Sequence, residues 1–527
     1  MTDIDLSKTY LGIEFGSTRI KGVLTDEQLT PLASGSYDWE NRFENGYWTY
    51  SVEDFITGLR TCFATLAEDV LTRYGKSLDT VGALGISGMM HGYLAFDKND
   101  ELLVPFRTWR NTTTGEAAAE LSELLRFNVP QRWSISHLYQ AILDGEEHIS
   151  SLDHITTLAG YIHYRLTGRF EVGIGEASGI FPIDSSALDY DAAMLDTLSV
   201  RLRERGFTRE LRKILPRVRV AGERGAYLTE EGARLLDPTG VLRAGIPLCP
   251  PEGDAGTGMV ATCSVRPCTG NISAGTSIFS MLVLEKPLSS YYTELDMVTT
   301  PDGAPVAMVH CNNCCAEIDV WARLFGEFAA LSGHPMKKSE VYDTLYRNAL
   351  RGAADCGGVV SYNFLAGEPV IGVESGVPMY FRSIDGHIDL ANFFRAQICT
   401  SVAALKLGND LLFEKEHVSA KRFTGHGGLF KTEGVAQQLL ADGFNTPISV
   451  MKTAGEGGAW GMAILAAYMV MGGERSLPDF LDELVFCGME VTTLSPTEEG
   501  SRGFARYIEN YKSGLSAVSA IPRSVEV

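Results

Sequence analysis

The chain has 527 residues, of which 45% are hydrophobic and 21% are charged, as in ordinary soluble proteins of more than one domain. Its formal net charge of −21 repels nucleic acid and anionic membranes, so neither is an expected partner. The acidic segment 1–5 lacks the apolar region of a signal peptide, and the longest apolar stretch, 458–471, is too short to span a bilayer. These features predict a cytoplasmic protein.

Residues 10–24 predict a β-hairpin with a polar turn. The segment 10–15 alternates like a half-buried strand, and 20–24 returns. The turn Gly16-Ser17-Thr18 offers backbone amides and two hydroxyl groups, which suit an anion. Glu14 stands where a carboxylate can help to hold a magnesium ion near phosphate oxygens. A plain hairpin with a surface glutamate explains the same pattern.

A capped helix is predicted over 51–74, followed by a buried strand at 81–86 and a further strand at 93–96. The loop between the two strands is Ser87-Gly88-Met89-Met90-His91-Gly92. In an alternating α/β pattern, a loop after a buried strand lies at the usual ligand edge of the sheet. His91 is therefore a candidate for binding a hydroxyl-rich ligand, although lone histidines are more often structural.

The segment Arg107-Thr108-Trp109-Arg110-Asn111 supplies stacking and polar groups just before a helix predicted at 113–127. Trp109 is equally compatible with a place in the core. Further on, 140–168 is predicted to be helical, with Gly168 as its stop signal, and 195–214 is predicted to be a charged, exposed helical region.

The stretch 251–258 places the carboxylate of Asp254 among three glycines and an alanine. It follows an apolar run, 246–249, that predicts a short buried strand, and it precedes 259–261, which can open a helical turn. Glycine lets the backbone and a ligand approach closely, so Asp254 can reach a small substrate. The alternative is that Asp254 only caps the following helix.

The first turn recurs in the second half of the chain. Gly275-Thr276-Ser277 leads into the strand predicted at 278–283, just as the turn at Gly16 leads into its second strand. Two copies of this strand, glycine-hydroxyl turn and strand predict duplicated domains, 1–265 and 266–527. A ligand held between the two turns would occupy an interdomain cleft.

Two glycine-rich segments precede predicted helices in the second half: 425–428 before 432–442, and 455–458 before 459–471. Glycines at a helix N-terminus let a nucleotide lie close to the backbone, although loop glycines explain either segment alone. Neither a Walker A motif nor a Rossmann fingerprint is present, so a nucleotide site would be of another kind.

The ten cysteines are expected to be free thiols. Their one cluster is His310-Cys311-Asn312-Asn313-Cys314-Cys315. No second pair follows at zinc-finger spacing, so the cluster predicts a buried segment leading into a helix at 316–328 in preference to a structural metal site.

Taken in order, these motifs resemble the FGGY family of carbohydrate kinases, which has the actin/hexokinase/Hsp70-like (ribonuclease H-like) fold. The resemblance runs from about residue 10 to about residue 471. It rests on the turns at Gly16 and Gly275, Met90-His91-Gly92, Tyr164-Arg165-Leu166-Thr167-Gly168, Gly253-Asp254 and Gly425–Gly428. The loop 87–92 most resembles the substrate loop of xylulokinases, so phosphorylation of D-xylulose to xylulose 5-phosphate is the leading expectation.

The resemblance implies an α/β fold of two duplicated domains around an interdomain cleft, with the sugar bound mainly by the first domain and ATP mainly by the second. It implies that Asp254 is the catalytic base and that magnesium serves as cofactor, with Glu14 and Asp254 as its ligands. The implied substrate contacts are Met90, His91, Trp109, Asn111 and Asp254. The implied nucleotide contacts are Gly16, Ser17 and Thr18 in a first phosphate loop, Gly275, Thr276 and Ser277 in a second, and Gly425, Gly427 and Gly428 in an adenosine loop.

Several positions depart from the family pattern. Glu14 stands where the family usually has aspartate, and His426 interrupts a loop that is commonly all glycine. The helix around Arg395 lacks its usual glutamate, and Trp109-Arg110-Asn111 differs from the xylulokinase tryptophan-asparagine-aspartate run.

These departures keep two alternatives open: a kinase for another ketose or polyol, such as ribulose, glycerol or a tetritol, and a non-catalytic ATP- and sugar-binding regulator. A homodimer is the assembly considered, and the sequence does not decide it.

Overall fold

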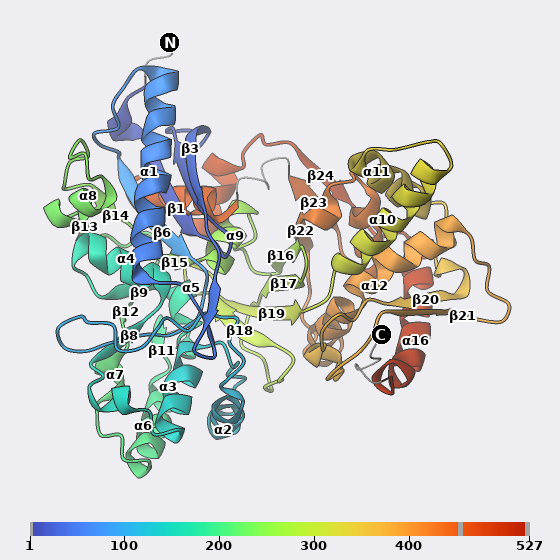
Figure 1. Cartoon of the computed structure of the whole chain (residues 1–527), viewed down its shortest axis with the longest axis horizontal. Coiled ribbons are helices and arrows are strands. Elements are labelled where there is room, and N and C mark those ends of the chain that lie inside the picture. Colours follow the sequence, from blue (N-terminus) through green and yellow to red (C-terminus); the bar gives the residue numbers. More distant parts are fainter. Residues whose placement is uncertain (1–3, 452–456, 522–527) are drawn as a thin grey trace. The chain divides into compact units, whose positions relative to one another are not determined.

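The computed structural model describes residues 4–451 and 457–521, so Gly455 and Glu456 of the second glycine-rich segment lie outside the described residues. The chain forms two compact units (Figure 1). Unit 1 comprises Met1–Val265, Met297–Val306 and Glu456–Gly488, and unit 2 comprises Arg266–Asp296, Ala307–Gly455 and Met489–Val527. The predicted boundary after residue 265 coincides with the end of the first segment of unit 1. Unit 1 also contains two later segments, 297–306 and 456–488.

Unit 1 is built on a mixed sheet with the strand order β13-β14-β6-β1-β2-β3, in which β15 also pairs with β6. As predicted, β1 and β2 form an antiparallel hairpin. Strand β6 runs parallel to β1 on its other side. The strands are β1 (Tyr10–Phe15), β2 (Arg19–Thr25), β3 (Pro31–Asp38), β6 (Ala83–Gly88), β13 (Ala226–Tyr227), β14 (Pro247–Leu248) and β15 (Glu252–Gly253).

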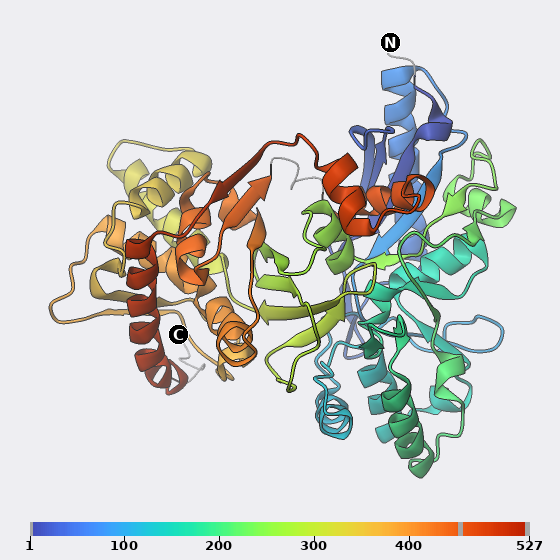
Figure 2. The same cartoon turned by 180° about the vertical axis from the view of Figure 1, so that it is seen from behind.

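Two long helices pack against this sheet. Helix α1 (Val52–Tyr74) begins at a capping box formed by Ser51 and Asp54 and covers β2 and β3. Helix α14 (Gly457–Met471) packs against β1 and β6, and its orange-red ribbon lies beside the blue strands in the rear view (Figure 2). Because α14 is apolar around its whole circumference, it is a buried helix of the kind expected inside a core.

A second, largely helical core completes unit 1. It contains residues of α2 (Gly115–Leu125), α3 (Ser134–Leu143), β7 (Leu94–Phe96), β8 (His154–Thr156), β9 (Glu171–Gly173), α5 (Ile174–Ala177), α6 (Ala192–Glu204), α7 (Leu211–Ile214) and β12 (Arg217–Arg219). Helix α4 (Leu158–Thr167) instead packs into the first core, beside the main sheet.

The single helix predicted over 140–168 is wrong. Helix α3 ends near Gly145, which has a φ of 65°, and β8 then pairs antiparallel with β7 before α4 begins. Likewise, Gly206, with a φ of 85°, separates α6 from α7 within the region predicted to be helical at 195–214. Glycine adopts this left-handed conformation without the steric cost that other residues incur, and it ends a helix there.

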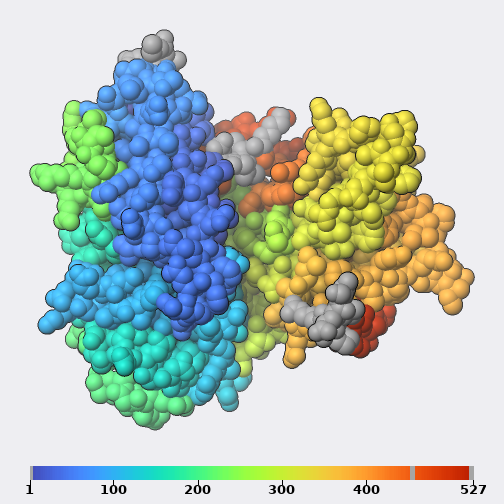
Figure 3. All heavy atoms as spheres, viewed as in Figure 1, coloured from blue at the N-terminus to red at the C-terminus, as the bar shows by residue number. Residues whose placement is uncertain are grey.

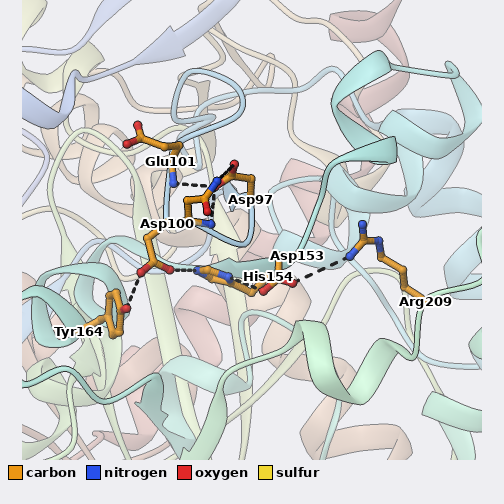
Figure 4. Close-up of polar contacts among 8 residues, drawn as sticks. Asp97, Asp100, Glu101, Asp153, His154, Tyr164 and Arg209 are labelled. Atoms are coloured by element: carbon orange, nitrogen blue, oxygen red, sulfur yellow. Dashed lines mark hydrogen bonds and ion pairs between the residues drawn. The ribbon is translucent and has the colours of Figure 1, made fainter.

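A polar network ties the paired strands β7 and β8 to α4 (Figure 4). The ring of His154 lies 3.2 Å from a carboxylate oxygen of Asp153 and 3.5 Å from one of Asp100. Asp100 also accepts a hydrogen bond of 2.7 Å from the hydroxyl group of Tyr164, in the last turn of α4. The motif from Tyr164 to Gly168 therefore serves here as a structural link and a helix end.

Unit 2 repeats the strand plan of unit 1. Its sheet has the order β18-β19-β17-β16-β22-β23-β24, so the run β22-β16-β17-β19 corresponds to β6-β1-β2-β3. Strand β16 pairs antiparallel with β17 and parallel with β22, as β1 does with β2 and β6. The strands are β16 (Thr269–Ala274), β17 (Ile278–Val283), β18 (Asp296–Thr299), β19 (Pro305–Cys311), β22 (Arg422–Gly427), β23 (Ile448–Met451) and β24 (Val491–Leu494).

The main helices of unit 2 are α10 (Ala316–Leu331), α11 (Lys338–Ala349), α12 (Leu390–Asp410), α13 (Val435–Phe444) and α16 (Glu498–Ser519). The yellow surface of α10 and α11 faces the viewer in Figure 3, and α10 exposes Leu324, Phe328 and Leu331. Across residues 4–451 and 457–521, no helix combines the length and apolarity needed to cross a bilayer.

Candidate active site

Asp254 is the first residue of helix α9 (Asp254–Ala261), with Gly253 as the N-cap, so the helix begins five residues before the predicted 259–261 turn. The side chain is partly exposed, and its Oδ1 accepts a hydrogen bond of 3.2 Å from the backbone N–H of Met90. Desolvation raises the pKa of Asp254, and the N–H groups of Met90 and Ala255 oppose that shift. The structure thus presents an accessible, oriented carboxylate.

Glu14 lies near the end of β1, between Lys21 on β2 and Ser87 on β6. It reaches the start of α14, where a Cβ atom added to Gly458 would lie 2.3 Å from its Oε1. Burial and the negative charge of Asp254 raise the pKa of Glu14 to about 7, and the backbone N–H of Ala459 opposes them. Glu14 and Asp254 therefore interact electrostatically within unit 1.

The first turn, Gly16-Ser17-Thr18, is held by the carbonyl side of its backbone. The indole N–H of Trp39 donates to the carbonyl of Gly16 at 2.7 Å, and the hydroxyl group of Tyr50 donates to that of Ser17 at 2.5 Å. Because aromatic donors occupy these carbonyls, the turn is fixed without engaging the hydroxyl group of Thr18, which is exposed. The N–H of Gly16 donates to the carbonyl oxygen of Arg19 at 3.0 Å, so an anion would be bound by the other amides of the turn and by its hydroxyl groups.

Met90 contacts Asp254 through its backbone N–H, and His91 follows it in the same loop. His91 has a φ of 71°, and its Nδ1 lies 3.3 Å from the carbonyl oxygen of Gly179. Its ring stacks on Trp133 at a centroid distance of 6.4 Å. A histidine with positive φ is uncommon and is maintained by its surroundings, which here include this carbonyl and this ring.

The structure gives different settings to Trp109 and Asn111. The partly exposed Trp109 donates its indole N–H to Oγ of Ser17 at 3.2 Å, which links its loop to the first turn. Asn111 is buried, and its amide group exchanges hydrogen bonds of 2.8 and 2.9 Å with the backbone of Trp48. Asn111 therefore positions Trp48, and its contact with a substrate stays a prediction.

Two buried glutamates beside Asp254 are not singled out by the sequence analysis. Glu252 accepts hydrogen bonds from the backbone N–H groups of Gly175 and Glu176, and burial raises its pKa to about 8. Glu176 is fully buried, and neither of its carboxyl oxygens makes a hydrogen bond of normal geometry within the described residues. Burial raises the pKa of Glu176 far above its ordinary value. No local motif marks Glu176, and Glu252 is marked only by its place two residues before Asp254.

In unit 2, the second turn and the first glycine-rich segment lie side by side. The turn Gly275-Thr276-Ser277 joins β16 to β17, and β22 runs parallel to β16 with Gly427 opposite Ala274. Gly427 has a φ of 101°, and a Cβ atom there would lie 2.3 Å from the carbonyl oxygen of Ala274. This close approach requires glycine. Gly427 and Gly428 are exposed, as a binding loop must be, whereas Gly425 is buried against the ring of Phe430.

Two positions of unit 2 that depart from the family pattern, His426 and the helix around Arg395, are buried to different extents. Burial lowers the pKa of His426 to about 4, so the residue that interrupts the glycines is a neutral imidazole at neutral pH. Arg395 is buried in α12 beside Cys399, so it lies in a helix, as expected from the sequence.

The residues present fit a magnesium ion. Magnesium keeps several of its waters and uses one or two protein carboxylates, and Glu14 and Asp254 are two carboxylates close enough for the charge of one to raise the pKa of the other. Among the residues that the structure describes, no three histidine, cysteine, aspartate or glutamate side chains are grouped to hold a metal ion.

Comparison with known proteins decides the family. The N-terminal domain of the FGGY family of carbohydrate kinases matches residues 9–260, and the C-terminal domain of the same family matches residues 270–470. The chain belongs to this family. The kinase is therefore a phosphotransferase that acts on a sugar hydroxyl group, as the motifs predict.

Individual relatives are distant but extend along the chain. Xylulose kinase from Lactococcus lactis is 21% identical to the kinase over 87% of this chain and 88% of that protein. Xylulose kinase from Haemophilus influenzae is 22% identical over 96% of this chain and 99% of that protein.

Solved structures share the fold. Ligand-bound xylulose kinase from Lactobacillus acidophilus matches 97% of this chain and 98% of its own, with a TM-score of 0.77 and 17% identity. Plasmodium falciparum glycerol kinase with ADP matches 98% of both chains, with a TM-score of 0.74 and 15% identity. These likenesses confirm the predicted fold of two actin-like α/β domains.

Proposed function

We propose that the kinase transfers the terminal phosphoryl group of ATP to a terminal hydroxyl group of a ketose, with D-xylulose as the leading substrate and Asp254 as the general base. The setting of Asp254 carries this proposal. Its carboxylate is accessible, is oriented by the N–H of Met90 and has a raised pKa. A general base must lie within hydrogen-bond reach of the substrate, and it works best when its pKa approaches the working pH.

The sugar assignment rests on the loop of Met90 and His91 and on the relatives. The loop lies next to Asp254 and resembles the substrate loop of xylulokinases, and the relatives that cover 87% and 96% of the chain are xylulose kinases. The run Trp109-Arg110-Asn111 is where this kinase differs, and one altered pocket contact is worth about 1–3 kcal/mol of discrimination. Another ketose or a polyol is therefore a defined outcome of the test below.

The remaining predicted residues would bind the nucleotide. The first turn at Gly16 and the second turn at Gly275 would donate to phosphate oxygens, and the exposed Gly427 and Gly428 would let the adenosine approach the backbone. Glu14 and Asp254 would hold magnesium, which supplies charge neutralisation of the phosphates when bound. Asp254 would accept the proton of the sugar hydroxyl group as its oxygen is phosphorylated.

The test is ADP release with magnesium-ATP over a panel of ketoses, aldoses and polyols, comparing the wild type with Asp254→Asn. We expect one sugar to give turnover and Asp254→Asn to lower kcat by about 10²–10⁴-fold while keeping the wild-type thermal transition. Asp191→Asn is the matched control, because Asp191 caps α6 and asparagine caps a helix equally well.

A wild-type rate in Asp254→Asn would refute the general-base assignment. Turnover with ribulose or glycerol but not with xylulose would replace xylulose as the assigned substrate. ADP binding without turnover on any sugar would favour the non-catalytic regulator.

A further inference from the structure

Cys314 and Cys315 form a vicinal dithiol at the start of α10, where Cys315 is the N-cap residue. Their Sγ atoms lie 3.5 Å apart. Cys314 is buried, whereas Cys315 is partly exposed. Cys311, at the end of β19, is also buried. The phosphoryl transfer proposed above uses none of these thiols.

The backbone of this dithiol holds the second turn. The N–H of Cys314 donates to the carbonyl oxygen of Thr276 at 3.0 Å, and the N–H of Cys315 donates to that of Gly275 at 3.1 Å. All four residues belong to unit 2. A change that twists the peptide between the two cysteines therefore moves the donors that fix the turn.

The geometry favours a bridging atom over a direct disulfide. A disulfide needs an S–S bond of about 2.05 Å and a Cα separation of at least about 4.4 Å, whereas consecutive Cα atoms lie about 3.8 Å apart. A direct bond between Cys314 and Cys315 would thus distort the backbone. A third atom placed between the two sulfurs can bond to both of them while they stay 3.5 Å apart.

We propose that Cys314 and Cys315 are a binding site for trivalent arsenicals, and that occupation of this site disturbs the Gly275–Ser277 turn. With phenylarsine oxide, both S–H bonds and the arsenic–oxygen double bond break. Two S–As bonds form, and the oxide oxygen leaves as water with the two thiol protons. Arsenic stays trivalent, so the step needs no oxidant. The partly exposed Cys315 forms the first bond, and Cys314 closes the ring.

The other cysteines provide controls. Cys356 and Cys399 are 3.8 Å apart at their Sγ atoms, but both are fully buried and closed to the reagent. Cys487 is exposed, and an arsenic atom bound to a single thiol is removed by excess monothiol. The Cys311→Ser variant shows whether arsenic is held by Cys314 and Cys315 alone or also needs the thiol of Cys311.

The binding test is intact-mass spectrometry of the full chain after phenylarsine oxide and an excess of 2-mercaptoethanol. The wild type, Cys487→Ser and Cys311→Ser are expected to keep one phenylarsenic group, which 2,3-dimercaptopropanol removes. Cys314→Ser and Cys315→Ser are expected to keep none. If the buried Cys314→Ser variant fails to fold, the partly exposed Cys315→Ser decides the result. An adduct that persists in Cys315→Ser, or no adduct in the wild type, would overturn the site.

The effect on the turn rests on the proposed function and is tested by calorimetric titration with ADP. Modified wild type is expected to bind ADP at least tenfold more weakly than untreated protein, while Cys315→Ser shows the same affinity with and without reagent. An adduct with unchanged ADP affinity would overturn the effect on the turn. If untreated wild type did not bind ADP, the proposed function would fail, and the mass measurement would still decide the dithiol site.

Discussion

Glu171 keeps its charge in a buried position because two side chains face it. Arg219 donates a hydrogen bond of 2.8 Å to its carboxylate, and His163 lies 3.5 Å away. Burial alone would raise the pKa of Glu171, but these neighbours hold it at about 2. Strand β9, which carries Glu171, leads directly into α5, and Gly173 donates to the carbonyl oxygen of Pro251. This carboxylate thus anchors the segment behind the Asp254 turn.

Glu171→Gln is expected to lower the free energy of unfolding by roughly 1.5–3 kcal/mol at neutral pH, the usual contribution of a hydrogen bond to a charged group. Because the folded state lowers the pKa from 4.5 to about 2, this stabilisation is full above pH 4.5 and is lost as the pH falls toward 2. The difference between wild type and variant should therefore shrink with acidification in urea titrations at pH 7, 4 and 3.

Glu223→Gln is the control, because Glu223 is exposed and contacts the same Arg219 at 3.1 Å. Exposed ion pairs contribute about 0–1 kcal/mol, so this variant should remain close to wild type. A gap between Glu171→Gln and wild type that stayed constant across the pH range would contradict the assigned charge.

Residue types and their order were enough to single out Asp254, Met90 and His91, because each follows a recognisable strand or glycine turn, and the structure brings Met90 into contact with Asp254. The same reasoning could not find Glu176. Its interest comes from two unpaired oxygens buried next to Gly253, and that contact depends on how β15 and α5 pack. Nor could it find the hydrogen bonds that occupy the amide of Asn111, since Trp48 is distant in sequence.

At the scale of elements, β1 and α14 meet at a glycine. A Cβ atom on Gly12 would lie 2.0 Å from the carbonyl oxygen of Ala459 and 2.4 Å from the backbone nitrogen of Ala463. Both contacts are with helix backbone, which cannot move aside as a flexible side chain does. Gly12 therefore sets how closely α14 approaches the strand that carries Glu14.

Gly12→Ala is expected to destabilise the kinase by about 3 kcal/mol or more, because overpacking against backbone separates the helix from the sheet. Urea unfolding of the purified variant measures this loss. Gly115→Ala is the matched control. Gly115 opens α2, and a Cβ atom there would lie 3.9 Å from the side chain of Gln131, so alanine should be neutral or slightly stabilising. Equal stabilities of the two variants would contradict the assigned contact.

The alternating residues of β1 were sufficient to predict a strand, and the apolar stretch of α14 to predict a helix, because both patterns are local. Their contact was not predictable, because no local pattern in β1 specifies a helix that begins at residue 457. The wrong helix at 140–168 has the same origin. Residues 154–156 read as helical in isolation, and their pairing with β7 gives them the extended conformation.

At the scale of the whole molecule, each of the two similar units is built from several separate segments of the chain. The two sheets repeat the same strand order, and the family domains match residues 9–260 and 270–470. Unit 1 nevertheless includes two segments from the second half of the chain, Met297–Val306 and Glu456–Gly488. The first half of the chain therefore lacks a part of its own core, and this part includes Trp460, Ile464 and Leu465, which are almost fully buried.

A polypeptide ending at residue 265 is accordingly expected to fold poorly. Without α14, the surfaces of β1 and β6 that the helix covers become exposed to water, and burying one large apolar side chain is worth about 1.5–3 kcal/mol. Fragment 1–265 should bind the dye ANS and unfold without a cooperative transition, which are the signs of lost tertiary packing. Thermal scans by near-ultraviolet circular dichroism would measure this.

The control is a single chain that joins 1–265 through a flexible glycine-serine linker to 457–488, because it restores α14 and nearly all of unit 1. This chain should lose ANS binding and regain a cooperative transition. A linked variant carrying Gly12→Ala should not regain it, since the restored helix could not approach β1. Cooperative unfolding of fragment 1–265 at the same midpoint temperature as the linked chain would show that α14 is dispensable. The close contact at Gly12 would then contribute little to the stability of unit 1.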